Sequence, residues 1–325
     1  MRRSARLVDG VLEATVVGSF SKIGYSTRRH LYDFAEPPRQ DGRVAVVTGA
    51  TSGLGLETAT QLASLGATTY LWARNDERAL RARAAIVARD DKADVRIVIG
   101  DMSDPEAIRS GFAKIASEND RLDILVHNAG AISEHYRRSE FGAEETVAAQ
   151  LLGPFLLTTL FLPLLRRAEP GRVIAVSSGG LYAERFNLAR MEMSAGDYDG
   201  VSAYARVKRA QFVINQEWSR RIDPKDVVFH AMHPGWADTP GVATSLPRFH
   251  RLMAPLLRSA AQGADTVVWL ATSEEAGSGS GEFWLDRRPR SGYKLPWTRS
   301  SDPRGDGDRL WRWCEERVNG TPVTK

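Results

Sequence analysis

The sequence predicts an α/β protein with one doubly wound parallel sheet of about seven strands and helices on both of its faces. From residue 43 onward, short runs rich in β-branched residues alternate with longer stretches that carry helix signals. The short runs are almost continuously apolar, which is typical of strands buried on both faces of a parallel sheet. Because strand–helix alternation gives right-handed crossovers, these strands should run in one direction. The expected strands are residues 43–48, 68–74, 95–101, 122–128, 172–178, 226–233 and 282–286.

The composition is that of an ordinary globular protein. With 325 residues, of which 42% are hydrophobic and 26% charged, the chain can bury a large core. Its net charge of +4, from 44 basic and 40 acidic residues, is too small and too evenly spread to favour nucleic acid as a partner. Several arginines are expected on solvated helix faces, among them Arg78, Arg81, Arg83 and Arg89.

Cysteine and histidine usage limits the chemistry further. The single cysteine, Cys314, rules out a disulfide within the chain and favours a reducing compartment, so we expect a cytoplasmic protein. The six histidines lack metal-ligand spacing, and no metal is expected. No apolar run approaches the roughly 18 residues that a membrane-spanning helix needs.

Two terminal segments lie outside the alternating pattern and leave residues 43–299 as the main domain. Residues 1–42 form an amphipathic extension that ends at Pro37-Pro38, and we expect its helix to pack on the domain or on a partner subunit of a homo-oligomer. Contact with a membrane surface is the alternative. Residues 300–308 are expected to be a flexible linker, followed by a short helix. The apolar residues at helical spacing in the extension are Leu7, Val8, Val11, Leu12, Val16, Phe20 and Ile23.

A glycine-rich turn follows the first expected strand. Residues 48–55 read Thr-Gly-Ala-Thr-Ser-Gly-Leu-Gly and lead directly into a helix. Glycines allow a sharp turn and a close approach to a pyrophosphate, and the helix N-terminus offers free N–H groups to that anion. This Rossmann-type arrangement predicts a dinucleotide site. Its expected contacts are Thr48, Gly49, Ser52, Gly53, Leu54 and Gly55.

The next two strands indicate which dinucleotide binds. NAD sites place Asp or Glu about 20 residues beyond the glycines to hold the ribose hydroxyls. Here Arg74 stands at that strand end instead, where it could meet the 2′-phosphate of NADP(H); the alternative is a solvated residue at a helix start. Asp101, followed by Met102, should meet the adenine, and Asp101 could also cap a helix. NADP(H) is therefore the preferred cofactor, with NAD(H) possible.

Tyr204 and Lys208 are the expected reacting pair. They are four residues apart in a helical stretch and so share one helix face. A lysine cation beside the phenol should lower the tyrosine pKa from its reference of about 10 towards a useful range. Ser177-Ser178, residues 128–130 (Asn-Ala-Gly) and residues 233–235 (His-Pro-Gly) lie at carboxyl ends of strands, where open α/β sheets bind ligands.

With these motifs the sequence resembles the short-chain dehydrogenase/reductase family over about residues 42–290. Thr-Gly-x-x-x-Gly-x-Gly at 48–55, Asn-Ala-Gly at 128–130, the second serine of 177–178, Tyr-x-x-x-Lys at 204–208 and Pro-Gly-x-x-x-Thr at 234–239 occur in the family's order. Residues 233–242, 262–266 and 20–25 are most similar to the branch called dehydrogenase/reductase family member 12, which is itself similar to retinol dehydrogenases.

The resemblance implies an oxidoreductase that moves a hydride between the nicotinamide and a carbonyl or alcohol. Tyr204 would be the proton donor or acceptor, Lys208 would hold the nicotinamide ribose, and Ser178 would orient the carbonyl. The remaining family positions would contact the cofactor, namely Asn128, Ala129, Gly130, Pro234, Gly235 and Thr239.

Two positions depart from the family pattern. His127 replaces the first asparagine of Asn-Asn-Ala-Gly, which we expect to be a tolerated change. Gln150 replaces the asparagine that completes the family's catalytic tetrad, in which a backbone carbonyl binds a water. Because Pro154 has no N–H, it should release the carbonyl of Gln150 four residues earlier and kink the helix. The competing interpretation is a dinucleotide-binding sensor or scaffold without turnover.

The substrate is a small molecule whose walls should come from residues 179–203 and 240–258. These segments are rich in apolar side chains, which favours a lipophilic substrate, although the same side chains could simply pack the loops down. They include Leu181, Tyr182, Phe186, Met191, Met193, Leu246, Phe249 and Leu252.

Overall fold

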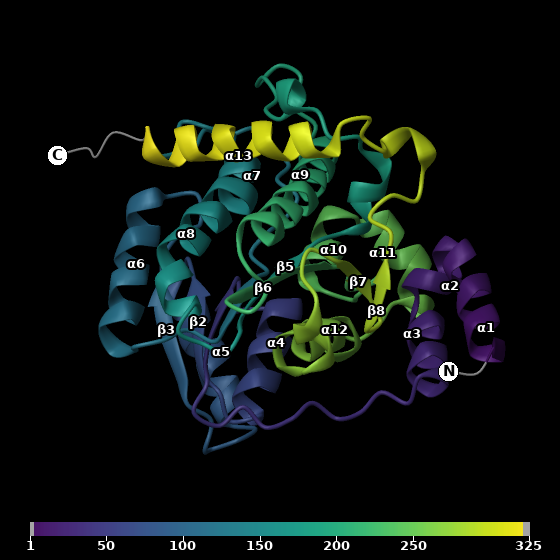
Figure 1. The fold of residues 1–325 in the computed structure, drawn as a ribbon, viewed down its shortest axis with the longest axis horizontal. Coiled ribbons are helices and arrows are strands. Elements are labelled where there is room, and N and C mark those ends of the chain that lie inside the picture. The colour runs from purple at the N-terminus through teal and green to yellow at the C-terminus, as the bar shows by residue number, and fades with distance from the viewer. Residues whose placement is uncertain (1–2, 321–325) are drawn as a thin grey trace.

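The computed structural model describes residues 3–320 and contains one eight-stranded sheet (Figure 1). The strand order is β3-β2-β1-β4-β5-β6-β7-β8, and all neighbours are parallel except β7 and β8. The predicted doubly wound sheet is therefore confirmed, with one more strand than expected. The strands are β1 Val44–Thr48, β2 Thr68–Ala73, β3 Val95–Ile99, β4 Ile124–His127, β5 Gly171–Val176, β6 Val227–Met232, β7 Phe283–Leu285 and β8 Arg288–Arg290.

Helices cover both faces of the sheet and divide the core into two large clusters. One cluster joins the sheet to α6, α8, α9 and α13, and the other joins it to α4, α5 and α12. The strand order reverses between β1 and β4, so the helices that follow these strands diverge and leave a crevice at their carboxyl ends. The covering helices are α4 Gly53–Ser64, α5 Asp76–Val87, α6 Pro105–Glu118, α8 Gly153–Leu165, α9 Gly200–Arg221, α12 Ala260–Thr272 and α13 Pro303–Asn319.

The C-terminal segment differs from the expected flexible linker. Helix α13 begins at Pro303, because Asp302 caps it through the N–H of Gly305 and proline is favourable in a first turn. The helix lies across α9 (Figure 1), and its Trp311 ring packs edge-on against Trp218 and Phe155. The prediction of a linker over residues 300–308 was wrong, since this segment opens a helix of 17 residues.

The N-terminal extension forms three helices, α1 Arg3–Ala14, α2 Val16–Phe20 and α3 Lys22–Leu31, at one end of the sheet (Figure 1). It packs on the rest of the chain, but mostly not through its apolar residues. Leu7, Val11 and Ile23 are 50% or more exposed, whereas Asp9 and Arg28 are buried. Periodicity identified the amphipathic face, and the structure turns most of that face outward, although Phe20 is buried.

One helical stretch is long and apolar enough to cross a membrane by length and composition, contrary to the sequence-based expectation. It spans residues 145–165, through α7 Glu145–Val147, the π-helical turn η1 Ala148–Leu152 and α8. About 67% of its most apolar window is buried inside the protein, and its leucines and phenylalanines belong to the main core. We therefore describe it as a core helix of the fold.

Candidate active site

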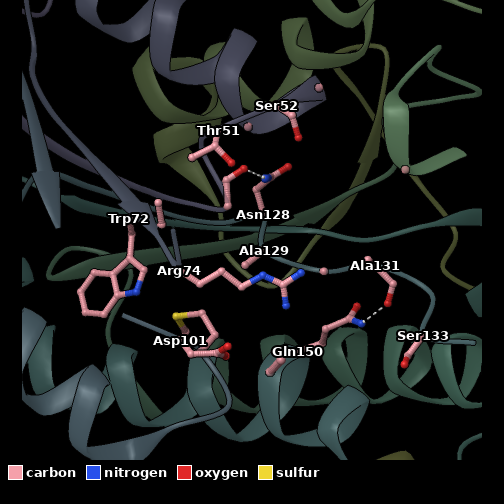
Figure 2. Close-up of a pocket in the computed structure, with 18 of the residues that line it drawn as sticks. Thr51, Ser52, Trp72, Arg74, Asp101, Asn128, Ala129, Ala131, Ser133 and Gln150 are labelled. Atoms are coloured by element: carbon pink, nitrogen blue, oxygen red, sulfur yellow. Dashed lines mark hydrogen bonds between the residues drawn. The ribbon is translucent and has the colours of Figure 1, made fainter. Parts of the chain in front are cut away.

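A groove of about 510 Å³ opens at the carboxyl ends of the central strands (Figure 2). It lies where the strand order reverses, between the turn after β1 and the segments that follow β2, β3 and β4. The structure thus brings together most residues that the sequence predicted for a cofactor. Those that line the groove are Gly49, Ser52, Gly53, Leu54, Gly55, Arg74, Asp101, Met102, Asn128, Ala129, Gly130, Gln150 and Thr239.

The glycine-rich turn has the backbone shape that the sequence predicted. Gly49 and Gly53 have positive φ values of 67° and 53°, which favour glycine. A Cβ on Gly55 would collide with the carbonyl of Gly49, so this position also needs glycine. Ser52 caps α4 without a side-chain hydrogen bond, and both its hydroxyl and the first N–H groups of the helix remain available to an anion in the groove.

Thr48 and Asn128 hold this turn in place through hydrogen bonds. The Thr48 hydroxyl accepts the N–H groups of Asn128 and Ala129, both at 3.0 Å, and donates to the carbonyl of Val126 at 3.2 Å. The Asn128 amide donates to the carbonyls of Thr48 and Gly49. Thr48 is buried and does not line the groove, so its contribution is to join the ends of β1 and β4.

Two arginines stand at the end of the groove that follows β2. Arg74 directly follows β2 and is exposed, and its side chain extends across the groove (Figure 2). Arg78, in the first turn of α5, lines the same groove. Within residues 3–320, no carboxylate pairs with either guanidinium. Arg78 was expected on a solvated face, but its position four residues after Arg74 could have indicated a shared site. Asp101, opposite them, accepts the N–H and hydroxyl of Ser103 and so shapes the turn after β3.

Ser178, Tyr204 and Lys208 meet just beyond the groove, where β5 ends and α9 begins. The side chains of Tyr204 and Ser178 lie close enough for the Ser178 hydroxyl to affect the pKa of the phenol. Lys208, one turn further along α9, places its Nζ 5.2 Å from the centre of the Tyr204 ring and donates to the carbonyl of Val176 at 3.0 Å. The expected triad is therefore assembled by β5 and one face of α9.

The electrostatics of this triad differ from the expectation that Lys208 lowers the tyrosine pKa. Burial raises the pKa of Tyr204, and the neighbouring Ser178 hydroxyl only partly opposes this effect. Burial also lowers the pKa of Lys208 to about 7, because the ammonium group loses its surrounding water. Desolvation is therefore the largest influence on the pKa of both groups.

Gln150 lies on the π-helical turn η1, four residues before Pro154. Its side-chain amide donates to the carbonyl of Ala131 at 2.9 Å and faces Gly130 at the groove (Figure 2). Pro154 cannot donate to the carbonyl of Gln150, as expected, but that carbonyl accepts the side-chain amide of Gln211 at 2.5 Å. The sequence analysis missed Gln211, which lies three residues after Lys208 and so on the same side of α9.

The segment after β6 closes the site from the other side. Thr239 and Pro240 line the groove, and the Thr239 side chain stands next to Gly53 of the glycine-rich turn. Pro234 and Gly235 are buried beneath this segment and do not reach the groove. Gly235 has a φ of 73° and leaves no room for a Cβ beside the Arg258 side chain.

The expected apolar substrate walls are only partly available. Leu181, Tyr182, Phe186 and Met191 are buried in the protein, so they pack their loops down as the alternative interpretation held. Other apolar side chains of the two segments are at least partly exposed, namely Met193, Leu246, Phe249 and Leu252.

These features fit an extended anionic dinucleotide. The open helix N-terminus and glycine turn suit a pyrophosphate, the unpaired arginines suit a further phosphate, and the Ser178–Tyr204–Lys208 cluster lies at the opposite end of the site. Among residues 3–320, no group of three or more histidine, cysteine or acidic side chains is placed to hold a metal ion.

Comparison with known proteins agrees with this geometry. Residues 43–248 match the family model described as short chain dehydrogenase. Human dehydrogenase/reductase SDR family member 12 is 39% identical over 263 residues, which cover 81% of this chain and 82% of the relative. Mouse retinol dehydrogenase 12 is 31% identical over 83% of this chain and 84% of its own length.

Among solved structures, an uncharacterized protein from Mycobacterium paratuberculosis superposes with a TM-score of 0.68 at 26% identity. The match covers 87% of this chain and 96% of that protein. The family model spans more than half of the chain and includes the glycine-rich turn, Ser178, Tyr204 and Lys208. The chain therefore belongs to the short-chain dehydrogenase/reductase family and is an NAD(P)-dependent oxidoreductase that acts on alcohol and carbonyl groups.

Proposed function

We propose that this protein is an NADP(H)-dependent reductase or dehydrogenase of lipophilic carbonyl compounds and alcohols. The observation that carries the proposal is the assembled cluster of Ser178, Tyr204 and Lys208 just beyond a groove that presents two unpaired arginines. When bound, the nicotinamide would supply or accept the hydride.

The three clustered side chains would handle the substrate oxygen. Tyr204 would donate its phenolic proton to the carbonyl oxygen during reduction and take it back during oxidation. Ser178, whose side chain lies next to that of Tyr204, would hold that oxygen beside the phenol. Lys208 has a pKa of about 7 and can gain or lose a proton near neutral pH, and it is placed to assist Tyr204 from the same helix face.

The preference for NADP(H) rests on Arg74 and Arg78. A 2′-phosphate between these guanidinium groups would form charge-assisted hydrogen bonds, each with a contribution of about 1.5–3 kcal/mol. Arg74→Ala should therefore weaken NADPH binding about 10- to 150-fold with little change for NADH. Arg81→Ala, on α5 and paired with Glu77, is the matched control. Equal losses for NADPH and NADH, or no loss, would contradict the preference.

The preference for a lipophilic substrate rests on the partly exposed side chains of α10 Pro240–Ser245 and α11 Pro247–Met253. Leu246 and Phe249 lie there, and Phe249 packs edge-on against Trp236 at 5.3 Å. The retinol dehydrogenase relatives, by their names, act on an apolar alcohol. A panel of short and long aliphatic and aromatic aldehydes and ketones, followed by NADPH consumption, tests this preference. Higher kcat/KM for short polar members would contradict it.

A sensor or scaffold without turnover is the second candidate, because Gln150 departs from the family pattern. The same assay distinguishes the two functions when it is run beside a binding titration. Tight NADPH binding with no turnover on any substrate would favour the sensor. Consumption of NADPH that depends on Tyr204 would favour the enzyme.

We further propose that this cytoplasmic protein contacts anionic membrane surfaces through its N-terminal extension. Leu7, Val8, Val11, Val16, Val17 and Ile23 are 41–72% exposed on its outer side. The acidic residues of α1 to α3 are Asp9 and Glu13, and both turn inward to arginine or lysine partners. The exposed Arg6 and Lys22 accompany the apolar side chains, which suits a lipid surface with negative headgroups.

Sedimentation with phosphatidylserine-containing vesicles tests this contact. Replacing Leu7 and Val11 together by serine should lower vesicle binding about 100-fold or more, because about 1.5–3 kcal/mol of burial is lost for each of the two side chains that enter the lipid. Leu80→Ser, on the exposed face of α5, is the matched control. If the unmodified protein stays in solution, or dimerises through this face instead, the membrane proposal is wrong.

A further inference from the structure

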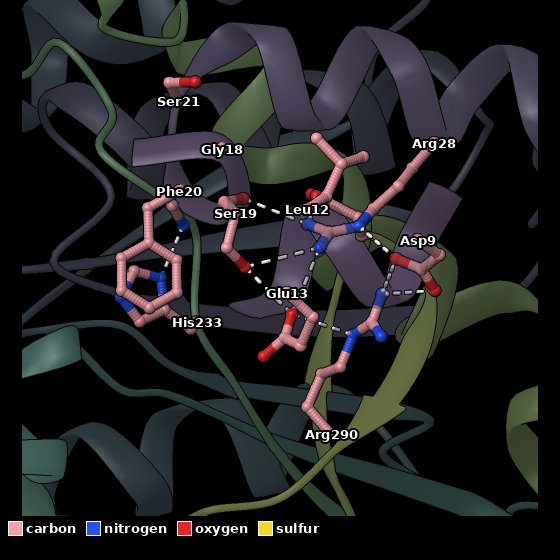
Figure 3. A network of polar contacts seen from close by, with 12 residues as sticks. Asp9, Leu12, Glu13, Gly18, Ser19, Phe20, Ser21, Arg28, His233 and Arg290 are labelled. Carbon is pink, nitrogen blue, oxygen red and sulfur yellow. Dashed lines mark hydrogen bonds and ion pairs between the residues drawn. The ribbon is translucent and has the colours of Figure 1, made fainter. Parts of the chain in front are cut away.

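The inner side of the N-terminal extension is held by a buried ionic network (Figure 3). Arg28 of α3 has a fully buried side chain and donates to Asp9 of α1 at 2.7 Å and to Asp286 at 2.8 Å. Arg290 of β8 reaches the same Asp9 at 2.7 Å and lies 3.6 Å from Glu13. The network therefore ties residues near the N-terminus to the far edge of the sheet.

Asp286 also bonds a second arginine, Arg258. It lies in the turn between β7 and β8 with a φ of 52° and is fully buried. Its two carboxylate oxygens accept from Arg28 on one side and from Arg258 on the other, the latter at 2.5 and 3.0 Å. Two arginines thus share one buried carboxylate between the extension and residue 258.

Arg258 in turn holds backbone carbonyls of both the extension and the segment after β6. It donates to the carbonyls of Ser19 and Phe20 at 2.9 Å and to that of Pro234 at 3.3 Å. The N–H of Trp236 donates to the same carbonyl of Phe20 at 2.8 Å. The carbonyl of Phe20 is therefore the point where the extension is joined directly to residues 234–236.

The Phe20 ring completes this junction. It stacks on the His233 ring at a centroid distance of 4.4 Å and an interplanar angle of 17° (Figure 3). Burial lowers the pKa of His233 to about 3, so its ring is neutral at physiological pH, and its Nδ1 accepts the N–H of Gly235 at 2.6 Å. The His233 ring and the edge of the Phe20 ring also lie beside Gly179, which directly follows Ser178.

Such a junction costs much free energy unless all its partners are in place. Unpaired buried charges are strongly destabilising, and an ion pair of this kind fixes geometry more than it adds stability. Here the junction fixes the position of residues 233–239, which place Thr239 beside the glycine-rich turn. It also fixes the backbone that follows Ser178. The extension thus supports both segments that border the reacting end of the groove.

We propose that the N-terminal extension is an integral part of the reaction centre, and that Phe20 is a positioning residue for the nicotinamide end of the site. The proposal rests on the proposed function, because it assumes a dinucleotide in the groove. Phe20 is 4% exposed and does not line the groove, so it acts through residues 233–239 and Gly179. The adenosine end, formed by Arg74, Arg78 and Asp101, has no contact with it.

This arrangement predicts that the two ends of the cofactor respond differently to loss of the Phe20 ring. Phe20→Ala in the full-length protein should weaken NADPH binding and lower kcat/KM by about tenfold or more, since small displacements of a positioned group have large effects on rate. Binding of 2′,5′-ADP, which carries the phosphate-bearing adenosine but no nicotinamide, should change less than about twofold. Hydrogen exchange of the Trp236 amide should accelerate.

Phe161→Ala is the matched control, since Phe161 is a buried phenylalanine of α8 that does not line the groove. It should lower the melting temperature without separating NADPH from 2′,5′-ADP affinity. Phe20→Tyr, which keeps the stacked ring, should restore most of the activity. Phe20→Leu, which keeps an apolar side chain but loses the stacking, replaces Phe20→Ala in the comparison if that variant does not fold. Equal losses for NADPH and 2′,5′-ADP, or unchanged NADPH affinity and Trp236 exchange in Phe20→Ala, would overturn the positioning role.

The proposed function fails in a different way. If the unmodified protein turns over no carbonyl or alcohol, the enzyme proposal is wrong, whereas NADPH binding, 2′,5′-ADP binding and Trp236 exchange still decide the role of Phe20. If it binds neither ligand, both proposals are wrong.

Discussion

At the scale of single residues, Tyr204 is the group on which the proposed chemistry depends. It is the phenol that Ser178 contacts, and a carbonyl oxygen placed beside both hydroxyls would be within reach of its proton. Tyr204→Phe should keep NADPH affinity and lose about 10²–10⁴ in turnover, which is the usual contribution of a positioned acid or base. Tyr198→Phe, a change at a nearby tyrosine bonded to Thr146, is the control. Turnover near normal in Tyr204→Phe would refute the assignment.

Lys208 provides a pH-dependent signature of the same site. Its pKa is about 7 in the folded protein and about 10.4 in an unfolded chain, so the unfolded state binds more protons between these values. The free energy of unfolding should therefore increase as the pH rises from about 7 to 10, and this gain should disappear as the pH falls back towards 7.

Lys208→Met removes this dependence. The variant should exceed the unmodified protein in free energy of unfolding at pH 6, and the excess should shrink by about 2–3 kcal/mol between pH 7 and pH 9. Denaturant titrations at both pH values measure it, with Lys22→Met on the exposed extension as the control. A pH-independent difference would mean that Lys208 keeps its charge when buried.

At the scale of elements, the π-helical turn η1 shows how the chain accommodates Gln150. Pro154 frees the carbonyl of Gln150 from the helical pattern, and Gln211 of α9 occupies it. Gln211→Leu should destabilise the protein by about 1–3 kcal/mol, because a buried carbonyl loses its donor. Gln216→Leu, on the same helix and only half-buried, should cost less. Equal stability of the two variants would show that the Gln211 bond contributes nothing.

Turnover of a Gln150 variant tests whether the side chain in turn η1 takes part in the reaction. Because the Gln150 side chain bonds only the carbonyl of Ala131, Gln150→Ala should keep turnover within about one decade, or under roughly 1.4 kcal/mol of barrier. A loss as large as that of Tyr204→Phe would instead assign a direct role to the Gln150 side chain.

The sequence predicted the elements best where burial is uniform. Seven strands were found because parallel strands covered on both faces are continuously apolar. The eighth, Arg288–Arg290, was missed because it is short, polar and contains Pro289 at the sheet edge. The start of α13 was missed because its glycine and aspartate residues are typical of a linker, although Asp302 and Pro303 carried the cap signal.

The candidate site was predictable in its motifs but not in its electrostatics or its supporting contacts. The glycine-rich turn and the Tyr204–Lys208 spacing are local features, so the sequence contains them directly. The pKa values of Tyr204 and Lys208 depend on desolvation by residues distant in the sequence, and the bond between Gln211 and Gln150 joins residues 61 positions apart. No local pattern reports such contacts.

At the scale of the whole molecule, the N-terminal extension is where periodicity alone misleads. An amphipathic pattern tells which residues share a helix face, but it does not tell which face is buried. Here the ion pairs of Arg28, Arg258 and Arg290 decide which face is buried. Their acidic partners lie in the extension and in the turn after β7, and these pairs form only if the polar side of the extension faces inward. The apolar side is then left outside.

This inverted packing predicts how the molecule responds to acid. Burial raises the pKa of Asp9, but hydrogen bonds from Arg290 and Arg28 outweigh it and lower the pKa to about 2, against 3.8 for a free aspartate. A lowered carboxylate pKa stabilises the folded state above the unfolded value, and this contribution is lost as the pH falls from about 4 to 2. The extension should therefore detach from the domain in this range.

Asp9→Asn tests this coupling between the extension and the catalytic domain. The variant should lose about 2 kcal/mol of stability at pH 7 and show a weaker dependence of stability on pH between 4 and 2 than the unmodified protein. Asp91→Asn, at an exposed position, is the control. Because the network ends at Arg258 and Phe20, NADPH affinity in Asp9→Asn should fall together with protection of the Trp236 amide. If the extension detaches at low pH while Trp236 stays protected, the extension and residues 233–239 are not coupled.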